Sequence, residues 1–212
     1  MAVKLSASRP SGKPTKLDAL EQVEVTSRAQ LRAWLKKNHT RTEGIWLVSY
    51  KKVVPEKHVG WDTIVEEALC FGWIDSVARA LDGERRMLYL CPRKPKSVWS
   101  KVNKERIVQL IATKRMTSAG VKRIDAAKKN GSWTSIDAAE AMEMPADLLR
   151  ALRAKKTAHK HYEAFPPSAR KQIIRWVLDA KTEVTRARRI EQTVFLAAKD
   201  LRANQQSLKN KI

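Results

Sequence analysis

Cysteine and glycine are both scarce in this chain of 212 residues, with two and seven occurrences respectively. Two cysteines cannot build the disulfide framework of a small secreted domain, and Cys70 and Cys91 do not form a CxxC metal motif. We expect both to be core thiols. The sequence also has no Walker A, GxGxxG, GxSxG or HExxH motif. These absences argue against a backbone phosphate cradle, so an enzyme would have to use scattered residues.

Long apolar runs are missing as well. No stretch of about 18 uncharged apolar residues occurs, and the N-terminal residues contain no signal-peptide core. We therefore expect a soluble cytoplasmic protein without membrane insertion. Acidic residues are few: the chain has 22 Asp and Glu residues but 43 Lys and Arg residues, which gives a formal net charge of +21. Polyanions such as nucleic acids are natural partners for such a surface, and the alternative is a basic exterior that serves only solubility.

Apolar residues make up 43% of the chain, which is enough to build a core. Residues 1–16 are rich in Ser, Pro and Lys without periodicity, so we predict a disordered basic arm. We predict an α+β part over residues 17–115, a mostly helical part over 116–205 and a frayed tail over 206–212. We expect the α+β part and the helical part to form one compact unit.

The α+β part carries strand and turn signals. The segment GIWLVSYKK, residues 44–52, has apolar residues on both faces, which predicts a central strand. Asp82-Gly83 is typical of a two-residue hairpin turn within residues 74–91. Such a turn places Asp75 and Val77 on the same face as Leu90 and Leu88. The predicted fold class is α+β, with a small, largely antiparallel sheet, packed helices and a mostly helical C-terminal part.

The stretch CPRKPKSVWSKVNKER, residues 91–106, joins the predicted hairpin to a helix expected over residues 98–114. Its cations precede the helix, where free N–H groups and the helix dipole attract anions. We interpret the stretch mainly as a structural connection and its basic loop as a secondary anion-binding site. The candidate residues for binding an anion or small ligand are Arg93, Lys94, Lys96, Ser97 and Ser100.

A second set of candidates belongs to the helix or faces it. At 100° per residue, one apolar stripe contains Trp99, Val102, Ile107 and Leu110. Asn103 and Arg106 fall within the same stripe. Polar groups there need fixed partners, so we expect them to stabilise the fold. Asp75 is either a carboxylate that lines a pocket with Arg93 and Asn103 or half of a structural salt bridge. The pocket or structural candidates are therefore Asp75, Trp99, Asn103 and Arg106.

Four segments between Glu66 and Ile190 resemble the YdeI/OmpD-associated family, also called bacteriocin-protection proteins, and the resemblance covers roughly residues 22–205. They read EEALCFGWIDS, LCPRKPKSVWSKVNKER, RMTSAG and FPPSARKQIIRWVLDAKTEVTRARRI. The resemblance implies a soluble bacterial protein linked to tolerance of cationic antimicrobial peptides or bacteriocins. It also implies association with an outer-membrane porin in one member, and it assigns no catalytic residue.

The leading hypothesis is thus a stress-tolerance protein that acts by binding a partner rather than by catalysis. Two alternatives stay open: a sequence-independent binder of nucleic acids or other polyanions, and a small-molecule enzyme with a pocket at the hairpin-to-helix junction. We expect no cofactor and no metal, because His159 and His161 lack a nearby Cys, Asp or Glu cluster that could supply further ligands. The oligomeric state stays open.

Overall fold

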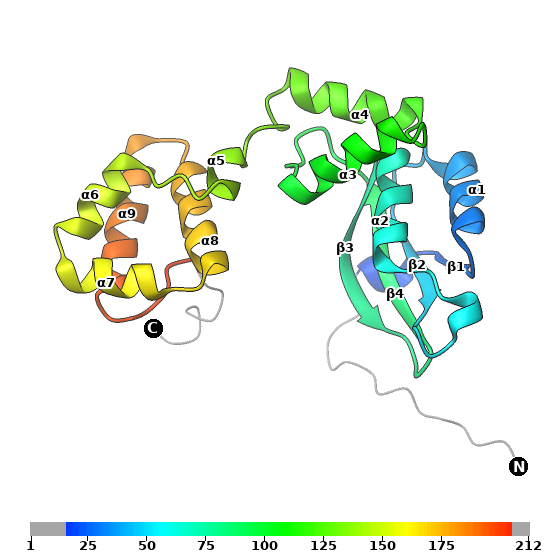
Figure 1. Cartoon of the computed structure of the whole chain (residues 1–212), viewed down its shortest axis with the longest axis horizontal. Coiled ribbons are helices and arrows are strands. Elements are labelled where there is room, and N and C mark those ends of the chain that lie inside the picture. The colour runs from blue at the N-terminus through cyan, green and yellow to red at the C-terminus, as the bar shows by residue number, and fades with distance from the viewer. Residues whose placement is uncertain (1–15, 205–212) are drawn as a thin grey trace, which may run out of the picture. The chain divides into compact units, whose positions relative to one another are not determined.

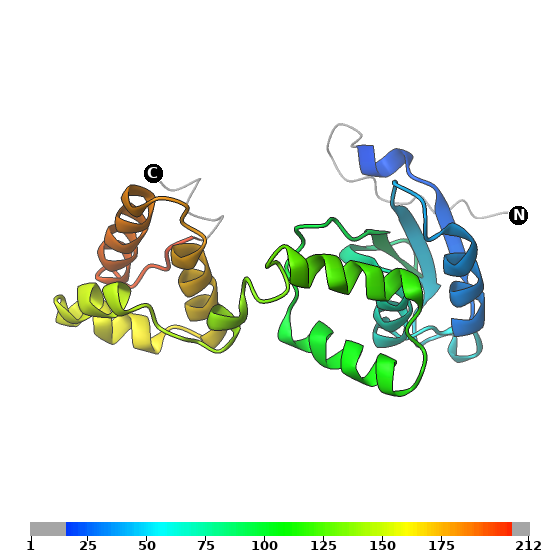
Figure 2. The ribbon, with the colours of Figure 1, turned by 90° about the horizontal axis from the view of Figure 1, so that it is seen from above.

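The computed structural model of the chain describes residues 16–204. Its internal contacts group these residues into two units (Figures 1 and 2). The first unit runs to Ser97 and continues from Val102 to Trp133, and the second comprises Val98–Lys101 and the residues from Thr134 onward. The first unit thus extends past residue 115, the limit predicted for the α+β part. The predicted tail, and the predicted arm except its last residue, lie outside the described residues.

Four strands form the sheet of the first unit: β1 (Gln22–Val25), β2 (Ile45–Tyr50), β3 (Trp73–Ala80) and β4 (Arg85–Pro92). Their spatial order is β1-β2-β4-β3. The pair β1 and β2 is parallel, and the other two pairs are antiparallel. The sheet is therefore largely antiparallel, as predicted, with one parallel edge.

Strand β2 lies between β1 and β4, which confirms the prediction of a central strand. Its first four residues, Ile45 to Val48, are all buried. The indole of Trp46 also donates a hydrogen bond from Nε1 to the carbonyl of Leu17, at 2.6 Å. Apolar side chains on both faces suit this strand because both faces are covered.

The hairpin of β3 and β4 follows the predicted register only in part. Asp75 pairs with Leu90, as predicted. A bulge between Asp75 and Ala78 then shifts the register, so that Ala78 and not Val77 pairs with Leu88. Val77 is left 43% exposed. An extra residue on one strand moves the following side chains by one position, and turn residues alone do not reveal it.

The turn itself also differs from the prediction. Asp82 and Gly83 both lack the positive φ that a two-residue turn of the expected type requires. Instead, Asp82 Oδ1 accepts hydrogen bonds from the backbone N–H groups of Glu84 at 2.9 Å and Arg85 at 2.6 Å. The aspartate side chain therefore organises a longer loop.

The helices of the first unit are α1 (Arg28–Asn38), α2 (Trp61–Cys70), α3 (Lys101–Ala112) and α4 (Ser118–Lys129). Helix α2 contacts α1, α4 and strand β3 (Figure 1). Helix α4 passes α2 closely at Gly120, where an added Cβ would lie 2.5 Å from the carbonyl oxygen at the end of α2. A residue without a side chain is what permits this approach.

The second unit is helical, with α5 (Asp137–Glu140), α6 (Ala146–Arg153), α7 (Lys156–Ala164), α8 (Pro167–Leu178) and α9 (Glu183–Ala197). Amphipathic faces of these short helices enclose one core. Its large members are Leu148, Leu152, Tyr162, Phe165, Ile173, Val177, Ile190 and Leu196. With a sheet and helices in the first unit and helices alone in the second, the predicted α+β fold class is confirmed. None of the helices described between residues 16 and 204 has the length and hydropathy to cross a membrane.

Candidate functional site

The basic loop after β4 contains one buried and two exposed cations. Arg93 is only 2% exposed, whereas Lys94 and Lys96 are exposed. Burial lowers the pKa of Arg93 to about 10, against the opposing effect of the Asp75 carboxylate. The backbone N–H of Arg93 continues the sheet by donating to the carbonyl of Gly72 at 3.0 Å. Arg93, predicted as a candidate for binding an anion together with Lys94 and Lys96, is therefore buried where the sheet continues one residue past Pro92, and only the two lysines are exposed.

The rest of this loop is fixed to the end of α4. The carbonyl oxygen of Pro95 accepts hydrogen bonds from Asn130 Nδ2 at 2.8 Å and Ser132 Oγ at 3.2 Å. Ser97 and Ser100, the two other anion-binding candidates, are half-buried. The loop thus holds the exposed Lys94 and Lys96 close to the C-terminal end of α4.

The apolar face of α3 was predicted correctly for two residues and incorrectly for a third. Ile107 and Leu110 are buried, but Val102 is 51% exposed. The cause is the start of the helix, which lies at Lys101 rather than at residue 98. Trp99 is 2% exposed but precedes the helix, so a stripe counted from it at 100° per residue is misplaced.

The two polar candidates of α3 do have fixed partners. Arg106 donates from Nη1 to Asn103 Oδ1 at 3.1 Å and from Nη2 to Asp62 Oδ1 at 2.5 Å. The guanidinium therefore connects the start of α2 to α3. Both Asn103 and Arg106 are half-buried rather than in the core.

Asp75 lies within electrostatic range of both arginines that the sequence singled out. Burial raises the pKa of its carboxyl group, and the charges of Arg106 and Arg93 oppose that rise. Asp75 at the start of β3 therefore lies near Arg93, which follows β4, and near Arg106 of α3. Asn103 joins this group through its hydrogen bond with Arg106. A carboxyl group with a perturbed pKa beside two cations occurs in functional sites and in structural ion clusters alike.

A more extensive ionic cluster was not predicted. The carboxylate of Glu67 is fully buried and accepts hydrogen bonds from three arginines. Arg28 Nε and Arg115 Nη2 each lie 2.7 Å from Oε1, and Arg32 Nη1 lies 2.8 Å from Oε2. The sequence held one signal of this cluster: Glu67 follows the buried Ile64 by three residues on the apolar face of α2, and a buried carboxylate requires cations.

Glu66 extends the cluster toward the surface. Its Oε2 accepts a hydrogen bond from Arg28 Nη2 at 2.7 Å and lies 3.9 Å from Arg115 Nη1. Arg32 also donates from Nη2 to the carbonyl of Arg115 at 2.8 Å. The cluster ties α1, α2 and the segment after α3 together. Because both oxygens of Glu67 are engaged, that carboxylate is suited to a structural role and not to proton transfer.

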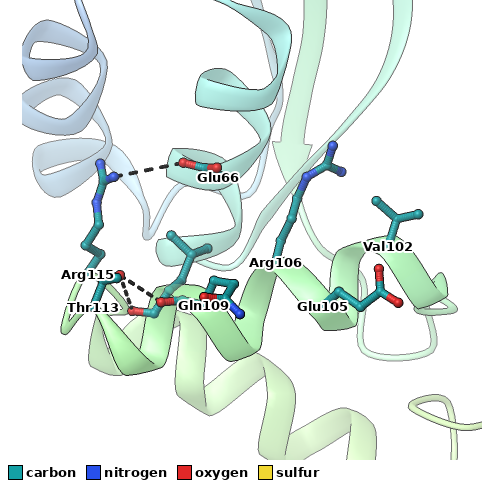
Figure 3. Close-up of a pocket in the computed structure, with 8 residues that line it drawn as sticks. Glu66, Val102, Glu105, Arg106, Gln109, Thr113 and Arg115 are labelled. Atoms are coloured by element: carbon teal, nitrogen blue, oxygen red, sulfur yellow. Dashed lines mark hydrogen bonds and ion pairs between the residues drawn. The ribbon is translucent and has the colours of Figure 1, made fainter.

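A hollow of about 370 Å³ borders this cluster (Figure 3). Its lining comes from α2, α3 and the segment after α3: Glu66, Val102, Glu105, Arg106, Gln109, Leu110, Thr113 and Arg115. Two acidic and two basic side chains balance its charge. Of the predicted candidates, Arg106 lines this hollow, and Asp75, Arg93 and Asn103 do not.

One member of the histidine pair in the second unit, His161, takes part in its packing. His159 and His161 both lie in α7. His161 donates from Nδ1 to the carbonyl of Ala197 at 2.8 Å and so connects α7 to the end of α9. Within residues 16–204, the structure contains no group of three or more His, Cys, Asp or Glu side chains that could hold a metal ion.

Two family models match separate parts of the chain. Residues 23–123 match a domain of unknown function (DUF8412). Residues 141–200 match the family described as "Bacteriocin-protection, YdeI or OmpD-Associated". Comparison with curated proteins and with solved structures finds no match. The resemblance predicted across residues 22–205 is therefore confirmed for residues 141–200, and the motif EEALCFGWIDS falls in the other matched region.

Proposed function

We propose that this chain is a cytoplasmic stress-tolerance protein of the YdeI/OmpD-associated type, which protects bacteria from cationic antimicrobial peptides or bacteriocins by binding a partner. The observation that carries the proposal is the match of residues 141–200 to the family described by bacteriocin protection. The matched residues include all of α6 to α9, which form a core of their own. The match thus covers a folded element that can present a binding surface.

One surface of this unit has the chemistry of a protein contact. A hollow of about 270 Å³ is lined by Gln172, Arg175, Trp176, Asp179 and Asn204. The guanidinium of Arg189 lies 5.2 Å from the centre of the Trp176 ring and so fixes the indole. Aromatic and arginine side chains are enriched in protein interfaces. We therefore propose this hollow as part of the partner-binding surface.

Bacterial survival tests this proposal. In a host that lacks its own copy of the gene, we expect the intact chain to raise survival in polymyxin B. Arg175→Glu reverses a charge at the hollow, and such a change in an interface weakens binding by about tenfold or more. It should remove most of the gain. Lys160→Glu, the same charge reversal at an exposed position on α7, should not. No gain from the intact chain, with normal expression, would refute the proposal.

A second candidate function is binding of nucleic acid through exposed lysines. Lys94 and Lys96 lie on the loop that is bonded to the end of α4, and Lys128 and Lys129 are exposed on the last turn of that helix. The side chain of Lys128 also contacts the ring of Trp133, at 5.6 Å from its centre. Basic side chains around an aromatic ring suit a phosphate backbone with adjacent bases.

Salt dependence distinguishes the two functions. If the four lysines neutralise DNA phosphates, the logarithm of the affinity should fall with the logarithm of salt concentration with a slope of about −3 to −4. Lys94→Gln with Lys96→Gln should reduce that slope by about 2. Lys155→Gln with Lys156→Gln, at exposed positions of the second unit, should leave it unchanged. A slope that both double variants change equally would show that the overall charge of the chain, and not this surface, binds DNA.

A further inference from the structure

Another depression in the first unit lies between the C-terminal end of α1, the residues that follow α2 and the N-terminal end of α4. It consists of two adjoining cavities of about 330 and 370 Å³. Both are lined by His39, Phe71, Ser118 and Ala119. We call this depression the α1/α4 hollow. Its size is that of a site for a small molecule rather than for an extended chain.

Every charged side chain that lines the α1/α4 hollow is a cation. Arg32 and Lys36 come from α1, and Lys122 and Arg123 come from α4. Arg32 forms an ion pair with Glu67. Within residues 16–204, the side chains of Lys36, Lys122 and Arg123 form no hydrogen bond or ion pair. The hollow beside α3 is lined by equal numbers of acidic and basic side chains, whereas the charged side chains of the α1/α4 hollow are all basic. Cations gathered in a concave surface without a carboxylate favour an anionic ligand.

The packing around the hollow fixes its shape. The side-chain Cγ of Arg123 lies 2.5 Å from where a Cβ on Gly72 would be, so the stem of Arg123 rests on this glycine. Gly72 has a φ of 74°, which other residues rarely adopt. The nearly buried ring of Phe71 contacts His39, with ring centres 5.9 Å apart. A preformed site loses less entropy when a ligand binds.

The first turn of α4 adds to the positive field that these side chains create. Thr117 precedes the helix, but its hydroxyl donates to the carbonyl of Cys70 at 2.5 Å instead of capping the helix. The backbone N–H groups of Ser118 and Ala119, which line the hollow, therefore lack a side-chain cap. Such groups supplement a cationic site as anion donors.

We propose that the α1/α4 hollow binds a small molecule that bears a phosphate or diphosphate group, with Lys36, Lys122 and Arg123 contacting the phosphate oxygens. A group with two or more negative charges matches several cations better than a single carboxylate does. The planar guanidinium of Arg123 can donate two parallel hydrogen bonds to phosphate oxygens. This site lies in the first unit and is independent of the function proposed from residues 141–200.

Titration of the full-length chain with sodium pyrophosphate at constant ionic strength tests the proposal. We expect saturable binding by calorimetry and amide shifts at Ser118 and Ala119 in nitrogen-15 NMR spectra. Lys122→Gln with Arg123→Gln should weaken binding by about tenfold or more, because charge-assisted hydrogen bonds are lost. The control, Lys155→Gln with Lys156→Gln, removes the same charge from exposed positions of the second unit and should change binding by less than about twofold, because these lysines do not line the hollow.

Lys36→Gln provides a second test that does not disturb the packing of α4 on Gly72. It should also weaken pyrophosphate binding, with an unchanged melting curve. Absence of saturable binding at millimolar pyrophosphate would overturn the proposal, as would equal weakening by the two double variants. If the Lys122 and Arg123 variant loses affinity for duplex DNA while the parent fails to bind pyrophosphate, the hollow belongs to a nucleic-acid surface, and the small-molecule proposal is wrong.

Discussion

Glu67→Ala is expected to lower the free energy of unfolding by about 3–5 kcal/mol, the effect typical of breaking a buried ion cluster. The substitution removes the one fully buried acceptor shared by Arg28, Arg32 and Arg115. The three guanidinium groups would then repel one another, and the contact between α1, α2 and the segment after α3 would loosen. Urea unfolding followed by circular dichroism measures the change.

Glu66→Ala is the matched control for this prediction. Glu66 is the neighbouring residue on the same helix and shares Arg28 with Glu67, but its side chain is 30% exposed. Partial exposure limits the contribution of such a pair to about 1 kcal/mol. Equal destabilisation by the two alanine variants would contradict the role assigned to Glu67.

Arg93→Ala is expected to destabilise the chain by about 2–4 kcal/mol, because it removes a large buried side chain and a cation that faces Asp75. Lys94→Ala with Lys96→Ala should change stability by no more than about 0.5 kcal/mol, since both lysines are exposed. The sequence pattern groups all three cations in one loop as candidates for binding an anion. The structure separates Arg93 from the other two.

Arg93→Met distinguishes the charge of Arg93 from its packing. Methionine retains much of the apolar stem and removes the guanidinium, so it should be less destabilising than alanine if packing dominates. Thermal melts of the variants provide the comparison. If Lys94→Ala with Lys96→Ala lowers the melting temperature as much as Arg93→Ala does, the distinction between the buried arginine and the exposed lysines is wrong.

Much of the first unit could be predicted from local sequence patterns. Apolar residues on both faces identified β2 as the central strand, because alternation along a strand reports which faces are buried. Asp82 marked the hairpin loop, since a short polar side chain can bond the backbone of a tight turn. The mostly helical part predicted over residues 116–205 likewise contains the helices of the second unit, and the family match to residues 141–200 lies within it.

Tertiary structure alone decided which charged residues are buried. Arg93 and Lys94 are adjacent and chemically alike, yet Arg93 is buried because β4 continues beside the residue that precedes β3. Glu67 gains its partners from segments that lie 35 to 48 residues away along the chain. The cations of the α1/α4 hollow likewise come from two helices that are distant in sequence. Periodicity reports only the neighbours of a residue within its own element, so long-range pairing and the sites that it builds need the folded chain.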